Sequence, residues 1–280
     1  DWYKENNITL HTGKQIAKVD RVNRKVVADD GTEEHYDRLL IATGSLPIML
    51  PVPGRDLDGV MAFRDIADVD RMLDAAGKYK EAVVIGGGLL GLEAANGLMK
   101  KGMQVTVVHL MDVLMERQLD SEAAALLRKS LEERGMKFAM GGRTEEILGE
   151  GGRVSGVKLA DGTILPAQLV VMAIGIKPNV DIARRAGIHC DRGIVVDDTM
   201  LSYDGRIYAV GECAQHRGAV YGLVAPLFEQ GKVCAVHLAK KAFASYKGSV
   251  TSTKLKVTGI DLFSAGDFSG GPGTEDIVMK

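Results

Sequence analysis

A glycine-rich segment carries the strongest chemical signal in the sequence. Gly86, Gly88 and Gly91 follow the spacing G-x-G-x-x-G. In this pattern the first glycine permits a tight turn, the second lets the backbone approach a diphosphate, and the third lets a helix pack closely on a strand. The N–H groups and the dipole at a helix N-terminus then favour an anion. The segment therefore predicts a dinucleotide-binding site.

The elements that must position these glycines are expected on both sides of them. Residues 82–85 are an apolar strand, a helix runs through Lys101 and stops at Gly102, and residues 105–109 form a second strand. A glycine motif alone is weak evidence, because such turns also occur for structural reasons. A complete βαβ unit around the motif favours coenzyme binding.

Two polar residues in this unit are candidates for contact with the coenzyme. His109 ends the second strand, where a carboxylate normally binds the adenosine ribose. A neutral imidazole can bind a ribose hydroxyl without repelling a 2′-phosphate. The choice between NADH and NADPH therefore stays open, with NADH favoured by the third glycine and by the lack of an arginine before Arg117. Glu93 either complements the helix dipole or faces the nicotinamide.

The rest of the sequence predicts an α/β fold. Strands and helices alternate, and the apolar residues 39–44 and 169–175 are typical of parallel strands covered on both faces. We expect two Rossmann-like doubly wound domains, the coenzyme domain being inserted into the other, and the start of a C-terminal α+β domain. Further strands are expected at residues 8–11, 16–20, 25–28, 137–140, 154–159, 193–196 and 207–211, and helices at residues 66–76, 121–134 and 224–244.

Composition excludes several classes of protein. The net charge of −2, with both signs interspersed, gives no basic field for nucleic acid or anionic lipid. The longest apolar stretch, residues 82–99, contains three consecutive glycines and a glutamate, so no membrane span is expected. Three scattered cysteines indicate neither a C-x-x-C dithiol nor a disulfide scaffold, which favours a reducing, cytoplasmic compartment. Two C-x-x-H pairs, at residues 213–216 and 234–237, are interpreted as coincidences, so no metal site is expected.

Four segments together resemble the two-dinucleotide flavoprotein reductases, the family of glutathione reductase, ferredoxin reductases and NADH oxidases. They are residues 41–44 with Pro47, residues 86–95, residues 173–175 with Pro178, and residues 205–213. The sequence segments GGGLLGLEAA, LMERQLD, VGEC and GLVAP are similar to those in the large subunit of NAD(P)H-dependent assimilatory nitrite reductases. This resemblance implies that hydride passes from NAD(P)H to FAD. Electrons would then reach iron–sulfur and sirohaem centres outside this chain, where nitrite becomes ammonium.

The resemblance also implies roles for individual residues. Ala42, Thr43 and Gly44 would line the FAD, and Arg64 is a further candidate for contact with it. Glu212 would bind the ribityl chain, with Gly211 beside it in the motif. Leu223 and Val224 would lie by the flavin ring. Family members usually have Asp where Glu212 stands. Gly175 and Glu93 would border the nicotinamide. Hydride transfer between stacked rings requires no acid, base or nucleophile, so no catalytic side chain is expected.

Domain boundaries follow from the same resemblance. We expect residues 1–78 to be the first part of an FAD-binding domain with a β-meander, 79–190 the NAD(P)-binding domain, 191–247 the return of the FAD-binding domain, and 248–280 the start of a C-terminal domain. The family's first glycine motif is absent before Asp1, so we expect a fragment. Three cysteines cannot hold a four-cysteine cluster. The implied partners are downstream redox domains or a small subunit, and a homodimer is compatible with the family.

Two alternatives remain open. One is another reductase of the same build: the electron-transfer subunit of assimilatory nitrate reductase, a ferredoxin or rubredoxin reductase, or an NADH oxidase. The other is a module that senses a nucleotide and catalyses nothing. Binding of NADH without reduction of the flavin would favour that module.

Overall fold

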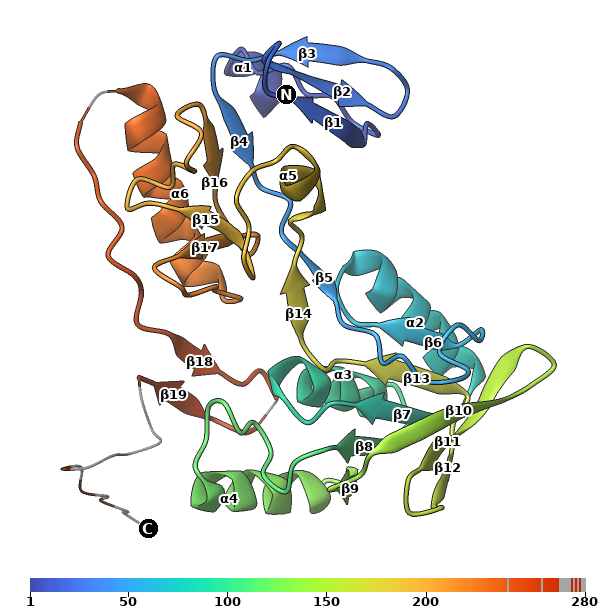
Figure 1. The fold of residues 1–280 in the computed structure, drawn as a ribbon. Coiled ribbons are helices and arrows are strands. Elements are labelled where there is room, and N and C mark those ends of the chain that lie inside the picture. The colour runs from blue at the N-terminus through green and yellow to red at the C-terminus, as the bar shows by residue number, and fades with distance from the viewer. Residues whose placement is uncertain (241, 258, 267–272, 274, 276, 278–280) are drawn as a thin grey trace. The chain divides into compact units, whose positions relative to one another are not determined.

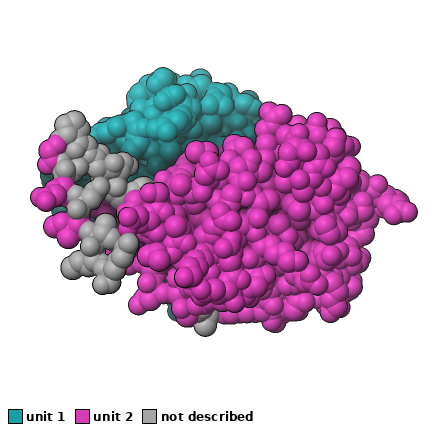
Figure 2. Space-filling view, turned by 90° about the horizontal axis from the view of Figure 1, so that it is seen from below, with its two compact units in different colours: residues 1–46, 177–249 teal, residues 47–176, 250–280 magenta. Residues whose placement is uncertain are grey.

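The computed structural model describes residues 1–240, 242–257, 259–266, 273, 275 and 277. The chain divides into two compact units, coloured separately in Figure 2. Unit 1 comprises Asp1–Leu46 and Lys177–Ser249, and unit 2 comprises Pro47–Ile176 and Val250–Lys280. A two-stranded sheet of β5 (Ser45–Pro47) and β14 (Ile176–Pro178) contains two of the three points at which the chain passes from one unit to the other, and the third follows Ser249.

Unit 2 is built on a five-stranded parallel sheet (Figure 1). Its strands, in spatial order, are β6 (Val60–Ala62), β13 (Leu169–Met172), β7 (Glu81–Ile85), β8 (Gln104–His109) and β9 (Lys137–Met140). The helices of this unit are α2 (Ile66–Lys78), α3 (Leu89–Lys100) and α4 (Ser121–Glu132). The chain moves outward from β7 to β9 and then returns to place β13 on the other side of β7. The strand order therefore reverses at β7. Open α/β sheets bind ligands at such a reversal point, beyond the carboxyl ends of the strands.

The two faces of this sheet are covered differently. On one face, alternate strand residues such as Val84 and Val107 pack against Leu92 of α3 and Leu127 of α4. On the other face, strand residues such as Val83 pack against an antiparallel meander of β10 (Thr144–Glu150), β11 (Arg153–Leu159) and β12 (Ile164–Pro166). The alternation of contacts follows from the two-residue period of a strand.

Unit 1 contains smaller sheets around its own core. β1 (Ile16–Asp20), β2 (Lys25–Ala28) and β3 (Glu33–His35) form an antiparallel sheet. Two parallel pairs join β4 (Leu39–Ile41) to β16 (Ile207–Ala209) and β15 (Ile194–Val196) to β17 (Ala214–His216). Its helices are α1 (Trp2–Glu5), α5 (Asp181–Arg185) and α6 (Val224–Ala239). Buried Ile41, Ile194, Tyr208, Cys213 and Cys234 form the centre of this core.

The predicted α/β class with Rossmann-like parallel sheets is confirmed, with local differences. The meander covers the face of unit 2 where a doubly wound sheet would carry helices. Residues 8–11 form no strand: Ile8 and Leu10 are exposed, and the short helix α1, capped by Asp1, lies before them. Helix α6 ends at Ala239, because Lys240 adopts a left-handed conformation.

The limits of the two compact units differ from the domain boundaries expected from the sequence. Residues 47–78 pack in unit 2, because β6 pairs with β13 and α2 contributes Met72 to the same core. β18 (Ser252–Lys254) and β19 (Phe263–Ala265) also belong to unit 2, where Leu255 and Val257 are buried beside α3 and α4 residues. Part of the expected C-terminal domain, including residues 267–272, lies outside the described residues. Across the described ranges, no helix is both long and apolar enough to cross a membrane.

Candidate coenzyme-binding site

Two of the three motif glycines are required by close backbone contacts. Gly86 has φ +120°, and a Cβ there would lie 2.3 Å from the carbonyl oxygen of Ala173, which follows β13. A Cβ on Gly91 would lie 1.9 Å from the carbonyl oxygen of Gly86. Both distances are far below van der Waals contact, so the turn and the start of α3 can pack against β13 only with glycine at these positions.

Gly88 stands in a different environment. A Cβ at this position would meet nothing within 4 Å in the described chain, and the backbone is extended, with φ −83° and ψ −175°. Gly88 is the N-cap of α3, and within the described residues no side chain caps this helix end. The packing of the protein therefore does not require glycine at position 88. A diphosphate fits this position, because its oxygens can approach the first N–H groups of α3 closely.

His109 is buried, and its contacts differ from the expected role at the ribose. Its Nδ1 accepts a hydrogen bond from the Gly87 N–H at 3.0 Å. Its Nε2 lies 3.0 Å from the Val113 carbonyl oxygen and 3.3 Å from a carboxylate oxygen of Glu116. Both ring nitrogens are thus used inside the protein. The role of His109 at a ribose hydroxyl remains a prediction, and in this structure its imidazole bonds to the glycine turn.

Glu93 also has a contact that the sequence did not predict. Helix α3 begins at Leu89, so Glu93 lies beyond its first turn, and the explanation by dipole complementarity is wrong. One carboxylate oxygen accepts the Lys256 N–H at 3.1 Å. Gly175 follows β13, beside β7 at the same sheet edge as the glycine turn, with φ +116°, and its carbonyl accepts the Ile48 N–H at 3.0 Å. The roles of Glu93 and Gly175 at the nicotinamide remain predictions.

Unit 1 brings most of the flavin candidates to one sheet edge. Ala42, Thr43 and Gly44 follow β4, and Gly211 and Glu212 follow its parallel neighbour β16. The Thr43 hydroxyl donates to the Asn179 carbonyl at 2.6 Å, and the Ser45 hydroxyl donates to the Glu212 carboxylate at 2.8 Å. The Gly211 N–H donates to Gln230 Oε1 at 2.9 Å. These bonds fix the two turns side by side within this unit.

The remaining flavin candidates lie elsewhere. Leu223 is the N-cap of α6, and Val224, its first residue, is 68% exposed. Arg64 belongs to unit 2, where its backbone N–H donates to Asp68 at 2.7 Å just before α2. The role of Arg64 at the flavin therefore remains a prediction. Ser45 and Gln230 were missed by sequence reasoning, although Ser45 directly follows the Ala-Thr-Gly segment.

The three cysteines are free thiols. Burial raises the pKa of Cys213 and of the half-buried Cys190, and it raises the pKa of Cys234 to about 11. A thiol with a raised pKa is a poor nucleophile at neutral pH. Of the residues that the structure describes, no three His, Cys, Asp or Glu side chains are grouped so that they could hold a metal ion.

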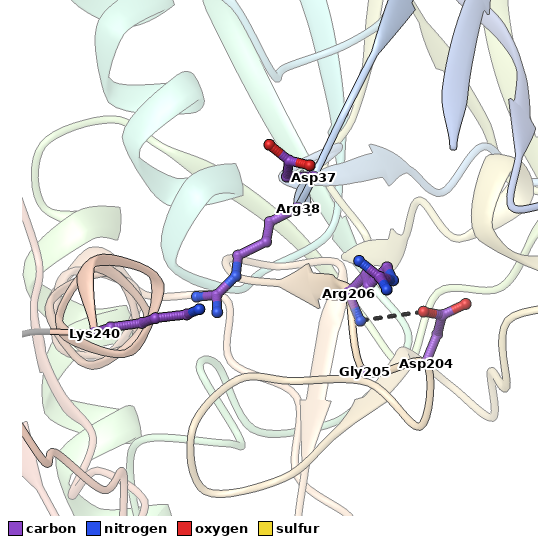
Figure 3. A pocket seen from close by; sticks show the side chains of 6 residues that line it. All are labelled: Asp37, Arg38, Asp204, Gly205, Arg206 and Lys240. Carbon is purple, nitrogen blue, oxygen red and sulfur yellow. Dashed lines mark hydrogen bonds between the residues drawn. The ribbon is translucent and has the colours of Figure 1, made fainter. Parts of the chain in front are cut away.

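A cavity of about 630 Å³ in unit 1 is separate from these candidates. It is lined by Asp37, Arg38, Asp204, Gly205, Arg206 and Lys240 (Figure 3). Asp37 and Arg38 precede β4, and residues 204–206 precede β16, so they lie at the opposite strand ends from Gly44 and Gly211. Lys240 follows α6. Arg38 donates to the His237 and Leu238 carbonyls at 3.2 and 2.9 Å, so its charge complements the carboxyl end of α6.

The chain is similar in sequence to known reductases. The chain is 55% identical over 269 residues to "Nitrite reductase [NAD(P)H]" of Bacillus subtilis (strain 168), covering 96% of this chain and 33% of that protein. It is 46% identical over 266 residues to "Assimilatory nitrate reductase electron transfer subunit" of the same organism, covering 95% of this chain and 34% of that protein. The chain spans about a third of the length of these two relatives.

Solved structures show the same fold. A ferredoxin reductase from Rhodopseudomonas palustris superposes with a TM-score of 0.87 at 31% identity, covering 94% of this chain and 66% of that one. The family model for pyridine nucleotide-disulphide oxidoreductases matches residues 3–244. The resemblance found in the sequence motifs is confirmed by this match. The chain belongs to the pyridine nucleotide-disulphide oxidoreductase family.

Proposed function

We propose that this chain is the part of a flavoprotein reductase that takes hydride from NADH and delivers it to FAD. The observation that carries the proposal is the glycine turn of unit 2. Gly86 and Gly91 are required by packing, whereas Gly88 leaves open space at the uncapped N-terminus of α3. A purely structural turn would not require glycine at position 88, whereas a diphosphate-binding turn does.

The chain's own residues would bind and orient the two cofactors. The first N–H groups of α3 would bind the coenzyme diphosphate, and Gly175 and Glu93 would border the nicotinamide. In unit 1, Ala42, Thr43 and Gly44, together with Gly211 and Glu212, would hold part of the FAD. Bound FAD would supply a two-electron acceptor, and no side chain need act as acid or base.

We further propose that the electrons reduce nitrite to ammonium at the iron–sulfur and sirohaem centres that the resemblance implies. The 55% identity to a nitrite reductase supports this proposal. The partners would be downstream redox domains or a small subunit. The three free thiols fit a cytoplasmic protein.

Anaerobic titration of the FAD-loaded protein with NADH tests the first step. We expect the absorbance of the oxidised flavin to bleach with one equivalent of NADH. NADH binding without bleaching would contradict hydride transfer and would favour a nucleotide-sensing module.

The second candidate is the electron-transfer subunit of an assimilatory nitrate reductase, which the 46% identity to such a subunit supports. The two candidates differ in the final acceptor. Sirohaem absorbance and ammonium formation from nitrite by the natural protein would support nitrite reduction. Electron delivery to a nitrate reductase, without ammonium formation, would support the second candidate.

A further inference from the structure

We propose that His109 is a positioning residue, whose imidazole holds the glycine turn in the conformation that binds the coenzyme diphosphate. This inference rests on the proposed function of the turn. It assigns His109 to the inside of the turn, whereas position 109 was expected to contact the ribose. All residues involved belong to unit 2.

Both hydrogen-bonding groups of Gly87 are held, one by the last residue of β8 and one by the loop that follows β8. The Gly87 N–H donates to His109 Nδ1 at 3.0 Å, and the Gly87 carbonyl accepts the Met115 N–H at 3.1 Å. Gly87 lies between the two motif glycines Gly86 and Gly88. Fixing both of its hydrogen-bonding groups therefore fixes the direction in which Gly88 leaves the turn and α3 begins.

The hydrogen bonds determine the protonation of the imidazole. Since a backbone N–H can only donate, Nδ1 must be the unprotonated acceptor. The proton then lies on Nε2, which donates to the Val113 carbonyl at 3.0 Å and faces Glu116 at 3.3 Å. His109 thus joins the turn to the loop of Val113 and Glu116 through its two nitrogens.

The packing around Gly87 leaves little freedom for another arrangement. A Cβ on Gly87 would lie 2.7 Å from His109 Cγ and 2.7 Å from Leu114 Cδ2, so the two side chains support the turn directly. Met115 is fully buried and has φ +51°, which is disfavoured for a residue with a side chain. The surrounding structure maintains this conformation, and through it the Met115 N–H reaches the Gly87 carbonyl.

The expected consequence is an effect on coenzyme affinity. Without the Nδ1 acceptor, the Gly87 N–H is left unsatisfied and the turn can rotate away from its binding conformation. Only a fraction of molecules would then present the α3 N–H groups correctly, and the apparent affinity falls by that fraction. The rate of the chemical step at saturating NADH would stay the same.

Two substitutions test this role in the full chain, with the dissociation constant of NADH measured by calorimetry. His109→Leu removes the acceptor, and we expect the NADH dissociation constant to rise about fivefold to tenfold, the loss of one hydrogen bond. His109→Asn keeps an acceptor atom on Cγ, and we expect affinity within about twofold of the natural protein. His35→Leu, at an exposed histidine of β3, is the matched control and should change nothing.

Unchanged NADH affinity in His109→Leu, or equal losses in His109→Leu and His109→Asn, would overturn the proposal. If His109→Leu does not fold, amide hydrogen exchange of the natural protein without NADH decides. We expect the Gly87 amide to exchange much more slowly than those of Gly88 and Leu89, and equal rates would overturn the proposal. If the glycine turn is not the NADH site at all, substitution of Gly88 will also leave the NADH affinity unchanged. That result distinguishes an error in the proposed function from an error in the role of His109.

Discussion

Substitution of Gly88 by valine separates coenzyme binding from folding more cleanly than any other change in the turn. The backbone of Gly88 is extended, with φ −83°, which valine adopts readily. A Cβ would meet nothing within 4 Å in the described chain, so the first atom of the new side chain has open space around it. Loss of glycine at the N-cap costs about 1 kcal/mol, and the reduced freedom of the unfolded chain offsets about 0.4–1 kcal/mol. The free energy of unfolding should therefore change little.

Affinity for NADH should respond strongly to the same change. The valine side chain fills the space that the diphosphate needs beside the N–H groups of α3. Losing one charge-assisted hydrogen bond costs about 1.5–3 kcal/mol, which raises the dissociation constant roughly 10- to 150-fold. FAD binding, which we assign to other residues, should persist.

Gly97→Val is the matched control for this experiment. Gly97 lies in the same helix α3, and a Cβ there also meets nothing within 4 Å. Calorimetric titration with NADH and urea unfolding should be measured on both variants. Equal NADH affinity in Gly88→Val and the natural protein, or equal losses in the two variants, would refute the assignment of the turn.

Three further predictions concern packing, thiol reactivity and pH. Gly91→Ala should lower the free energy of unfolding by about 2 kcal/mol in urea titration, because its Cβ would lie 1.9 Å from the Gly86 carbonyl oxygen and the backbone must shift; unchanged stability would contradict that packing. Cys234, whose pKa burial raises to about 11, should react with a thiol reagent at pH 8 only as the protein unfolds, so fast labelling of the folded protein would contradict this prediction. Hydrogen bonds from Arg217, which has the larger effect, and from His216 lower the pKa of Asp198. The stability that this carboxylate contributes is therefore present at neutral pH and is lost as the pH falls below about 4. Asp198→Asn should therefore destabilise the protein at pH 7, with a difference that closes in acid, and a difference independent of pH would count against this ion pair.

Local patterns in the sequence predicted the elements that carry the coenzyme site. The apolar strand β7, the glycine motif and α3 are adjacent in the chain, so their geometry follows from short-range rules. The Ala-Thr-Gly and Val-Gly-Glu segments were found from family motifs, and the structure places both after the parallel strands β4 and β16. The family and the α/β class followed from these same segments.

Long-range contacts could not be predicted in this way. The bond from Gly87 to His109 joins residues 22 positions apart, and it depends on the rotamer of a buried ring. The contact of Glu93 with Lys256 depends on how residues 250–257 return to unit 2, and no local pattern encodes that return. The absence of a strand at residues 8–11 has the same origin, since an apolar pattern predicts a strand only where a partner strand is available.

A crystal structure of the chain with bound NADH tests the central claim most directly. We predict diphosphate oxygens within hydrogen-bonding distance of the first N–H groups of α3, in the open space beside Gly88, with His109 still bonded to the Gly87 N–H. Density for NADH elsewhere, with the space beside Gly88 filled by protein side chains or by solvent alone, would contradict the account.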